Sequence, residues 1–310
     1  MKIAELNETS ARPARGEPLA EMTQSFGLVI QPSEVYPDIA ALNDRAAAIE
    51  HSLRGCGAVL LRGFGFELAS MEELTARFGT RFTSHHATAI GRRERVTETT
   101  ATVNLGTRPF AWHRERGYAP FAPDLVFFFC ERPARTGGET FLSDGCAIFE
   151  QLTPSSRDFV SQSSVEYRYP LPRESWPLAL GAADEAGAEA ALTRMAERLS
   201  SVEALSWKFS AEGVKARYRA PMLTSVRWTG RASFCNQVIF RAPRILLGDG
   251  SKLPARLLRE LQQLADANSY PIVWQRGDLA LIDNSRVMHA RGQIGDPERR
   301  ILARMCHVDA

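Results

Sequence analysis

Residues 109–130 of the chain read PFAWHRERGYAPFAPDLVFFFC, and this stretch determines the fold that we expect. Glycine at 117 and prolines at 109, 120 and 123 interrupt it, and no helical period of apolar residues runs through it. It ends in an apolar, aromatic run at 125–130. Aromatic runs that are bounded by glycine and proline are typical of strands and loops. The stretch therefore predicts a mainly β protein.

On both sides of this stretch, short apolar runs alternate with segments of helical period. Glycine, proline and capping residues mark where these segments begin and end. We expect helices at 38–53, 71–78, 144–152, 182–205 and 251–267, and strands at 57–61, 139–142, 271–275, 279–283 and 300–308. The sequence thus predicts a β core with helical insertions.

One domain accounts for most of the 310 residues. Residues 1–25 are polar and are expected to form a flexible N-terminal arm. Residues 26–310 then form a single domain, with a helix-rich insertion at about 165–225 that includes the alanine-rich part of the sequence. There is no internal repeat, which argues against solenoids and propellers.

Composition and charge exclude several classes of protein. Lysine and arginine number 38 against 36 aspartate and glutamate, a net charge of +2 that gives no reason to expect nucleic acid or an anionic membrane as partner. The longest apolar run is far shorter than the roughly 20 residues of a membrane helix, and the N-terminus lacks the apolar region of a secretory signal. The five cysteines are sparse and include no C-x-x-C pair, which suits a reducing compartment. We expect a cytoplasmic enzyme.

A histidine and a glutamate two residues apart are the first candidates for a metal site. His113 and Glu115 lie in the strand-like segment 110–116, and residues i and i+2 of a strand project from the same face. A histidine from a distant strand would complete a 2-His-1-carboxylate triad. This triad leaves positions open for a cosubstrate and dioxygen on Fe(II). The pair alone is weak evidence for a metal site, because H-x-E is common by chance on protein surfaces.

His289 and Arg300 strengthen this interpretation. The segment 279–284 is a strand that ends in a polar turn, and His289 follows it, with Arg300 eleven residues further on. The forked guanidinium of arginine suits bidentate binding of a carboxylate. Thr140, on a short strand of its own, offers a hydroxyl to the same carboxylate. A metal, an arginine and a hydroxyl together indicate a dicarboxylate that chelates the metal.

Four motifs together resemble a known family. They are Trp112-His113-x-Glu115, Thr136-Gly137-Gly138-Glu139-Thr140, Asp283-Asn284, and His289 with Arg299-Arg300-x-x-x-Arg304. In order and spacing, from about residue 55 to 308, they are similar to the Fe(II)/2-oxoglutarate dioxygenases of the taurine dioxygenase (TauD/TfdA) type. The resemblance implies a double-stranded β-helix, or jelly-roll, fold and the use of Fe(II), 2-oxoglutarate and O2.

The same resemblance implies roles for individual residues. His113, Glu115 and His289 would bind the iron. Thr140 and Arg300 would hold the distal carboxylate of 2-oxoglutarate, and Arg304 matches the position from which some relatives reach an anionic group of the substrate.

Glu115 also indicates a branch of the family. Taurine dioxygenase itself has aspartate there, whereas glutamate resembles the clavaminate synthase branch, the amino-acid hydroxylases and the syringomycin-type aspartyl hydroxylases. Halogenases have a small residue at this position, so halogenation is disfavoured. The implied reaction is hydroxylation of an unactivated C–H bond in an amino acid or an amino-acid-derived natural-product intermediate. This substrate could be free or bound to a peptidyl carrier protein. Desaturation, cyclisation and epoxidation remain open.

Other polar residues have less specific interpretations. Asn104, Asn236 and Gln237 are candidate substrate donors, and are equally well explained as satisfied amides of a β core. His51, the pair His85-His86 and His307 are expected outside the metal site, and Arg92-Arg93-Glu94-Arg95 is typical of a solvated loop. Two other classes remain: a zinc hydrolase, although the H-E-x-x-H signature is absent, and a β-barrel binding module without catalysis.

Overall fold

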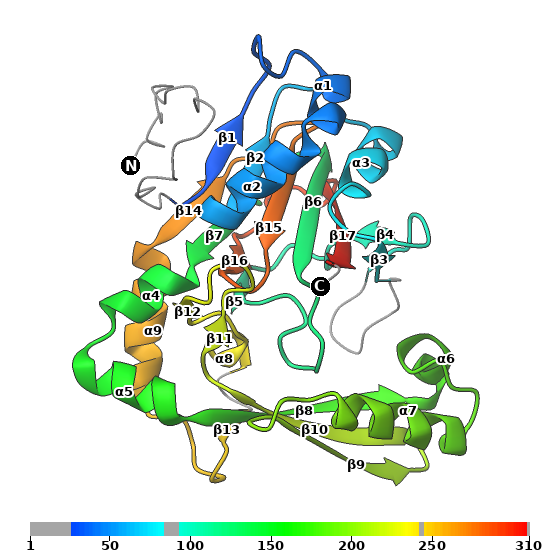
Figure 1. Ribbon diagram of the computed structural model, residues 1–310, viewed down its shortest axis with the longest axis vertical. Coiled ribbons are helices and arrows are strands. Elements are labelled where there is room, and N and C mark those ends of the chain that lie inside the picture. The colour runs from blue at the N-terminus through cyan, green and yellow to red at the C-terminus, as the bar shows by residue number, and fades with distance from the viewer. Residues whose placement is uncertain (1–25, 84–92, 242–244, 309–310) are drawn as a thin grey trace, which may run out of the picture.

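Two facing sheets form the centre of the computed structural model, which describes residues 26–83, 93–241 and 245–308 (Figure 1). The larger sheet has the strand order β1-β2-β15-β6-β17-β3, with β4 also paired to β17, and the smaller has the order β14-β7-β16-β5. The larger sheet contains β1 (Leu28–Ile30), β2 (Ala58–Leu61), β3 (Arg81–Phe82), β4 (Thr100–Thr102), β6 (Leu125–Arg132), β15 (Leu279–Asp283) and β17 (Arg300–His307). The smaller sheet contains β5 (Phe110–His113), β7 (Thr140–Asp144), β14 (Ser269–Ile272) and β16 (Val287–Arg291). The expected mainly β architecture is confirmed.

The apolar run at 125–130 becomes β6, a central strand that is buried on both faces. Val126 and Phe128 point into the layer between the two sheets, where they pack against residues of β15, β16 and β17. Phe127 and Phe129 point the opposite way, toward the helices on the outer face. A strand that is covered on both faces requires an unbroken apolar run instead of an alternating one, which explains this segment.

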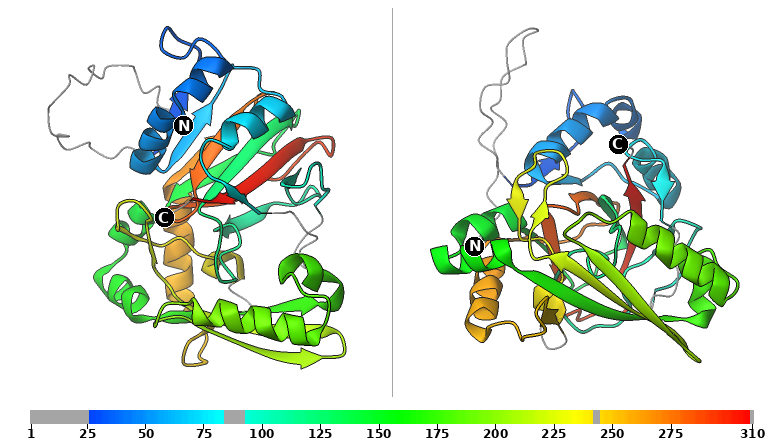
Figure 2. Two further views of the ribbon diagram at one scale, coloured as in Figure 1. Left: turned by 45° about the vertical axis from the view of Figure 1, so that its right-hand side comes forward. Right: turned by 60° about the horizontal axis from the view of Figure 1, so that its bottom comes forward.

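Three helices cover the outer face of the larger sheet (Figures 1 and 2). They are α1 (Ile39–Asp44), α2 (Ala46–Cys56) and α3 (Leu68–Thr75). The single helix expected at 38–53 is interrupted at Arg45 and ends at Gly57 instead of Gly55, because Gly57 adopts the left-handed conformation, with φ of 79°, that closes a helix. Asp38 caps the first helix by accepting a hydrogen bond from the Ala41 N–H at 2.9 Å.

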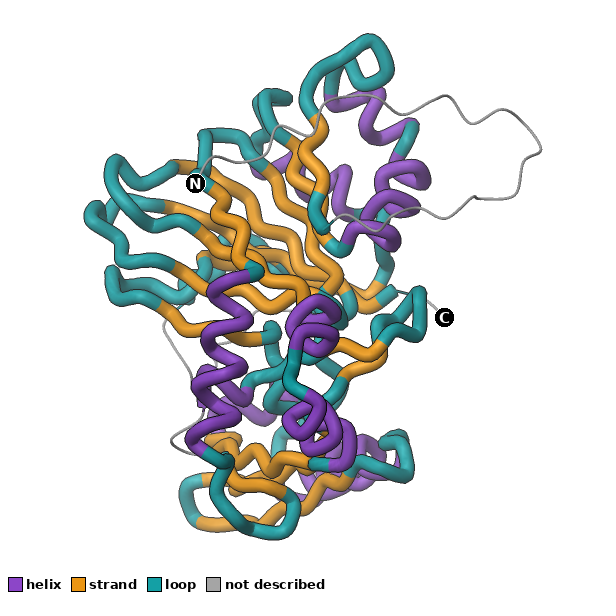
Figure 3. The backbone as a smooth tube through the Cα atoms, turned by 90° about the vertical axis from the view of Figure 1, so that its left-hand side faces the viewer, coloured by secondary structure: helices purple, strands orange, loops and turns teal. Residues whose placement is uncertain are grey.

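The outer face of the smaller sheet is covered by α9 (Ala255–Ala267) and α4 (Gly145–Gln151), with α5 (Pro154–Gln162) following α4 (Figure 3). The buried face of α9 includes Leu257 and Leu261. Trp112 of β5 lies on this side of the sheet and donates its indole N–H to Asp266 of α9 at 2.7 Å. The residue next to His113 is therefore anchored to a helix.

The insertion at 165–225 differs from the expected helix-rich segment. It is built on a four-stranded sheet of order β13-β8-β10-β9, with only short helices and one longer helix, α7, beside it (Figures 1 and 2). Its elements are β8 (Ser164–Pro172), η1 (Arg173–Ser175), α6 (Trp176–Ala179), α7 (Glu185–Glu197), β9 (Ala204–Ser210), β10 (Gly213–Pro221) and β13 (Leu246–Leu247). Buried residues alternate with period two in β8 and β10, which is the strand pattern that the alanine-rich α7 concealed in the sequence. The short elements β11 (Thr224–Ser225), β12 (Ala232–Ser233) and α8 (Val238–Arg241) follow β10.

Three expectations concern the chain as a whole. The N-terminal arm and the pair His85-His86 lie outside the described residues. All five cysteines lie in the described part of the chain, where they are buried and form no disulfide bond. Within the described part of the chain, no helix has the length and apolar character to cross a membrane.

Candidate metal and cosubstrate site

Two neighbouring strands of the smaller sheet bring His113 and His289 together. His113 ends β5 and pairs in register with His289 of β16. Their neighbours Trp112 and Met288 belong to the outer core, so alternation along each strand turns both imidazoles toward the layer between the sheets. The ring centroids are 4.1 Å apart, and the ring of Phe128 packs edge-on to His289 at 5.1 Å.

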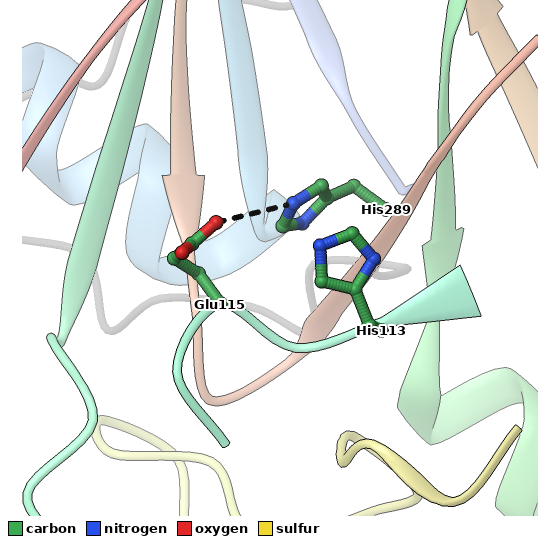
Figure 4. A group of neighbouring side chains, drawn as sticks. All are labelled: His113, Glu115 and His289. Carbon is green, nitrogen blue, oxygen red and sulfur yellow. Dashed lines mark ion pairs between the residues drawn. The ribbon is translucent and has the colours of Figure 1, made fainter. Parts of the chain in front are cut away.

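Glu115 completes this cluster although it lies beyond the end of β5. One nitrogen from each histidine and one carboxylate oxygen of Glu115 all lie within 4.8 Å of one another, and all three residues are buried (Figure 4). The Nε2 atom of His289 lies 3.6 Å from Oε2 of Glu115. The chain turns directly after Glu115, where Arg116 has a φ of 54°. The approach of Glu115 to the two histidines therefore depends on this turn as well as on strand alternation.

The buried side chain of Asn284 holds the backbone of Glu115. Its Oδ1 accepts the Glu115 N–H at 3.0 Å, and its Nδ2 donates to the Glu115 carbonyl at 3.0 Å and to the Pro123 carbonyl at 2.7 Å. Asn284 follows β15 in the larger sheet. Asn284 of the Asp283-Asn284 motif thus holds Glu115 in place through hydrogen bonds to its main chain, made from the opposite sheet.

The protonation of the cluster suits a metal ion. Nδ1 of His113 lies 2.8 Å from the Ala111 carbonyl and donates to it, which leaves Nε2 with a free lone pair. Burial, together with the nearby His289, lowers the pKa of His113 to about 3, so this imidazole is neutral at physiological pH. Nδ1 of His289 is buried without a hydrogen-bond partner among the described residues. Two histidines and one carboxylate match the ligand set of non-haem Fe(II), so the residues present fit this metal.

Arg93 binds the carboxylate of Glu115, which sequence analysis did not anticipate. Its Nη2 atom lies 3.0 and 3.3 Å from the two carboxylate oxygens, and its Nε donates to Asn104 Oδ1 at 3.3 Å. Burial acts to raise the pKa of Glu115, but the charge of Arg93 outweighs burial and holds this pKa well below its usual range. The expectation of a solvated loop is wrong for Arg93, because its side chain is only 12% exposed.

Thr140 lies beside Arg299 and not beside Arg300. The Nη2 atom of Arg299 lies 3.4 Å from Thr140 Oγ1, and the indole N–H of Trp274 donates to the same hydroxyl at 3.0 Å. Arg300 forms ion pairs with Glu94 and Glu131, and its side chain is 36% exposed. The expected pairing of Thr140 with Arg300 therefore has to be corrected. A β-bulge between Arg300 and Ile301 shifts the register of β17 at this point.

A second half-buried arginine, Arg291, adds positive charge near Arg299. Burial, with a further contribution from Arg291, lowers the pKa of Arg299 to about 10, at which it is still charged at neutral pH. Arg291 donates to the main-chain carbonyls of Asn104 and Arg108. Both arginines line a cleft of about 260 Å³, and neither forms an ion pair with a described residue. Two such arginines favour an anionic ligand in the cleft.

Of the four predicted substrate residues, three lie away from the metal cluster or bind other parts of the chain. Arg304 lies on the outer face of β17, where it donates to the Glu72 carbonyl and to Thr75 Oγ1, both at 2.6 Å, so its expected contact with substrate has to be corrected. Asn236 donates to the Met222 carbonyl at 2.7 Å and accepts the Val238 N–H at 2.8 Å.

Gln237 donates to the Arg114 carbonyl at 2.8 Å and accepts from Arg241 at 2.9 Å. The side-chain amides of Asn236 and Gln237 thus support neighbouring loops, which agrees with the interpretation of both as satisfied amides. Asn104 remains near the cluster through its contact with Arg93.

Sequence reasoning missed Arg93 and Arg299. Arg299 stands next to the predicted Arg300, so the sequence contained the pair but not which of the two turns toward Thr140. For Arg93 the chain offers no local signal, because its distance of 22 residues from Glu115 is bridged only in the folded protein.

The fold and the cluster define a class of protein. A jelly-roll of two facing sheets, with two histidines and a glutamate between them, is the architecture of a mononuclear non-haem iron enzyme. The profile of the Taurine catabolism dioxygenase TauD, TfdA family matches residues 17–306. The chain belongs to this family and is an Fe(II)- and 2-oxoglutarate-dependent dioxygenase. This assignment sets aside the zinc hydrolase and the non-catalytic binding module.

Known proteins agree with this assignment. A clavaminate synthase-like protein of Arabidopsis thaliana is 24% identical over 278 residues, which cover 83% of this chain and 84% of the relative. Among solved structures, PvcB from Pseudomonas aeruginosa is similar with a TM-score of 0.60 and 17% identity, over 92% of this chain and 86% of that chain. A putative α-ketoglutarate-dependent taurine dioxygenase from Burkholderia xenovorans has a TM-score of 0.58 and 16% identity, over 92% and 88% of the two chains. At these identities the structures support the fold.

Replacing Asn284 by alanine is expected to loosen Glu115. The change leaves the buried N–H and carbonyl of Glu115 without partners, each worth about 1–3 kcal/mol. We expect metal affinity to fall by about 10- to 100-fold, as is typical when a residue that supports a ligand is lost. Titration with Mn(II), followed by the paramagnetic resonance of the free ion, measures this.

Asn268→Ala, which removes the contacts of Asn268 with Gln151 and with the Leu264 carbonyl at the end of α9, is the matched control and should bind Mn(II) like the wild type. Equal affinity of the Asn284 and Asn268 variants would contradict the positioning role.

Proposed function

We propose that this dioxygenase hydroxylates an unactivated C–H bond of an amino acid or of an amino-acid-derived natural-product intermediate. The observation that carries the proposal is the buried cluster of His113, Glu115 and His289. Its carboxylate is a glutamate, as in the amino-acid-hydroxylating branch that the sequence resembles. A halogenase would need this carboxylate position vacated for a halide.

Each residue of the site has a part in this proposal. His113, Glu115 and His289 hold Fe(II), while Thr140 and Arg299 hold and orient the far carboxylate of 2-oxoglutarate in the cleft that Arg291 also lines. When bound, the iron and 2-oxoglutarate together supply the oxidant that attacks the C–H bond. The contribution of the protein is placement and exclusion of water, which the packing of Phe128 against His289 serves.

A screen for succinate release tests the proposal. We expect anaerobically loaded Fe(II) protein, given 2-oxoglutarate and O2, to release succinate faster when the right amino acid, free or carrier-bound, is present. The product should be heavier than the substrate by one oxygen atom.

A product that has instead lost two hydrogen atoms would replace hydroxylation by desaturation or ring closure. An absence of stimulation by every amino acid, in a protein that binds both iron and 2-oxoglutarate, would contradict the proposed substrate class.

A further inference from the structure

A second cavity lies between the core and the insertion. The loop that joins β5 to β6 reaches the sheet of β8 and β10, where Tyr118 packs edge-on to Tyr169 at 5.6 Å (Figure 1). Between this loop and the sheet is a cavity of about 470 Å³, a volume typical of small-molecule sites. Among the described residues that line it, none is a metal ligand or an arginine assigned to 2-oxoglutarate. The cavity is therefore separate from the site that the proposed mechanism uses.

Arg114 brings a positive charge to this cavity. It stands between His113 and Glu115 in the chain, but its side chain lines the cavity and not the metal cluster, as alternation along an extended segment requires. Its N–H donates to the Asn236 carbonyl at 2.9 Å, and its carbonyl accepts from the Gln237 side chain at 2.8 Å. The guanidinium is thus carried by a segment whose main chain is held in place.

The half-buried guanidinium of Arg114 is only partly satisfied within the chain. Its one hydrogen bond to a described residue is long, 3.4 Å from Nη1 to Thr224 Oγ1, and its buried Nε has no partner there. Burial raises the pKa of the nearby Asp283, and Arg114 acts to lower it, but the two side chains form no ion pair. A guanidinium with an unused buried donor favours an anionic ligand that accepts from it.

Two tyrosines and a glutamate determine which anion fits. Tyr167 and Tyr218 are buried in the lining, with ring centroids 6.3 Å apart. The Tyr167 hydroxyl accepts the Gln237 N–H at 3.3 Å, and its own proton has no acceptor in the described part of the chain. The Tyr218 hydroxyl donates to Glu203, which also accepts from Ser200 at 2.7 Å. Because Glu203 lines the cavity too, its negative charge disfavours a second carboxylate on the ligand.

Apolar side chains form much of the rest of the lining. Phe121 and Val202 line the cavity and are 38% and 63% exposed, so they mark its opening. Phe121 has a φ of 57°, in the left-handed region that disfavours residues with a Cβ atom, and Arg198 lies over its ring at 4.7 Å. Strained backbone of this kind gathers at functional sites. An exposed aromatic ring held in this way at an opening favours a ligand with an apolar body.

We infer that this cavity is a second binding site, which takes a small monocarboxylate with an apolar body. Arg114 and Tyr167 bind the carboxylate, the apolar side chains of the opening contact the body, and Glu203 rejects dicarboxylates such as 2-oxoglutarate. The inference goes beyond the proposed function and does not rest on it. A molecule bound here lies on the other side of the segment 113–115 from the metal cluster, so it is not the molecule that is oxidised.

Binding without turnover tests the inference. Saturation-transfer NMR titrations compare the straight-chain carboxylates from butanoate to octanoate, each with its amide and with the dicarboxylate of equal length. The protein is loaded with Zn(II) and N-oxalylglycine, which fill the metal and cosubstrate sites, and the titrations are repeated without them. We expect at least one carboxylate to bind equally well in both forms. Its amide, and in the loaded form its dicarboxylate, should bind at least about 10-fold more weakly.

Three variants assign the binding to the cavity. Arg114→Gln should weaken the carboxylate by about 10- to 100-fold, the equivalent of a charge-assisted hydrogen bond. Glu203→Gln should bring the dicarboxylate toward the affinity of the monocarboxylate, a gain that unfolding cannot produce. Arg217→Gln removes an exposed arginine next to Tyr218 in β10, on the opposite face of that strand, and should bind like the wild type.

Several outcomes would overturn the inference. They are no carboxylate binding to the wild type, equal binding of carboxylate and amide, unchanged affinity in Arg114→Gln, or no gain of dicarboxylate binding in Glu203→Gln. Loss of carboxylate binding on loading with Zn(II) and N-oxalylglycine would also overturn it, because the carboxylate would then occupy the metal site. Failure of the proposed function looks different, since the titrations of the unloaded protein need neither iron nor turnover.

Discussion

Replacing His289 by alanine is expected to abolish metal binding and succinate formation together. His289 is the one member of the cluster from β16, and it lies against both His113 and Glu115. Without it, one nitrogen and one carboxylate remain, which hold Fe(II) poorly. Loss of a residue that only supports a ligand lowers metal affinity or activity by about 10- to 100-fold, so loss of a ligand should exceed about 100-fold. Mn(II) titration and a succinate assay measure the two effects.

His307→Ala is the matched control for this experiment. His307 ends β17, and its ring nitrogen lies 3.7 Å from Asp124, away from the cluster. The His307 variant should keep both metal affinity and succinate formation. Normal Mn(II) affinity in the His289 variant would show that the three residues do not form the metal site, whatever their distances.

Replacing Arg299 by alanine is expected to raise the KM for 2-oxoglutarate by about 100-fold, the equivalent of one or two charge-assisted hydrogen bonds. Arg299 is half-buried next to Thr140, whereas Arg300 pairs with glutamates at the surface. Exposed ion pairs contribute only about 0–1 kcal/mol. Arg300→Ala should therefore change the KM by no more than about threefold.

Direct titration of N-oxalylglycine into the Mn(II)-loaded variants separates binding from turnover. Arg299→Ala should lose affinity for this analogue, and Arg300→Ala should retain it. If Arg300→Ala loses affinity and Arg299→Ala keeps it, the far carboxylate of 2-oxoglutarate is bound by Arg300, as the spacing from His289 had indicated. Both variants should melt close to the wild type, so that the comparison reports on the ligand.

The β core could be predicted from local pattern. The run at 125–130 is apolar on both faces, and such a run can only be a strand inside a layered structure or part of a buried helix. Its glycine- and proline-rich surroundings decide for the strand. The strands of the insertion were harder to predict from the sequence. The alanine-rich residues of α7 dominate the hydrophobic pattern there, and β8, β9 and β10 show their alternation only in short pieces.

The candidate metal ligands could also be proposed from sequence, because their chemistry restricts the choice. Few histidines are present, and His113 and Glu115 stand two residues apart. The route by which they converge was only partly foreseen. Glu115 lies beyond β5, and the turn at Arg116 together with Asn284 holds it in place.

The sequence by itself determined the mainly β core, the three candidate ligands and the arginine pair, since residue type and alternation are local properties of the chain. Only the tertiary structure decided that Arg299 lies beside Thr140, that Arg304 faces outward and that Arg93 reaches Glu115. The physical reason is alternation along β17. Ile301, Ala303 and Met305 face the layer between the sheets and Leu302 faces the outer side, so Arg300 and Arg304 fall on the outer side of the strand. Contacts between distant segments, such as Arg93 with Glu115, exist only once the sheets have closed on one another.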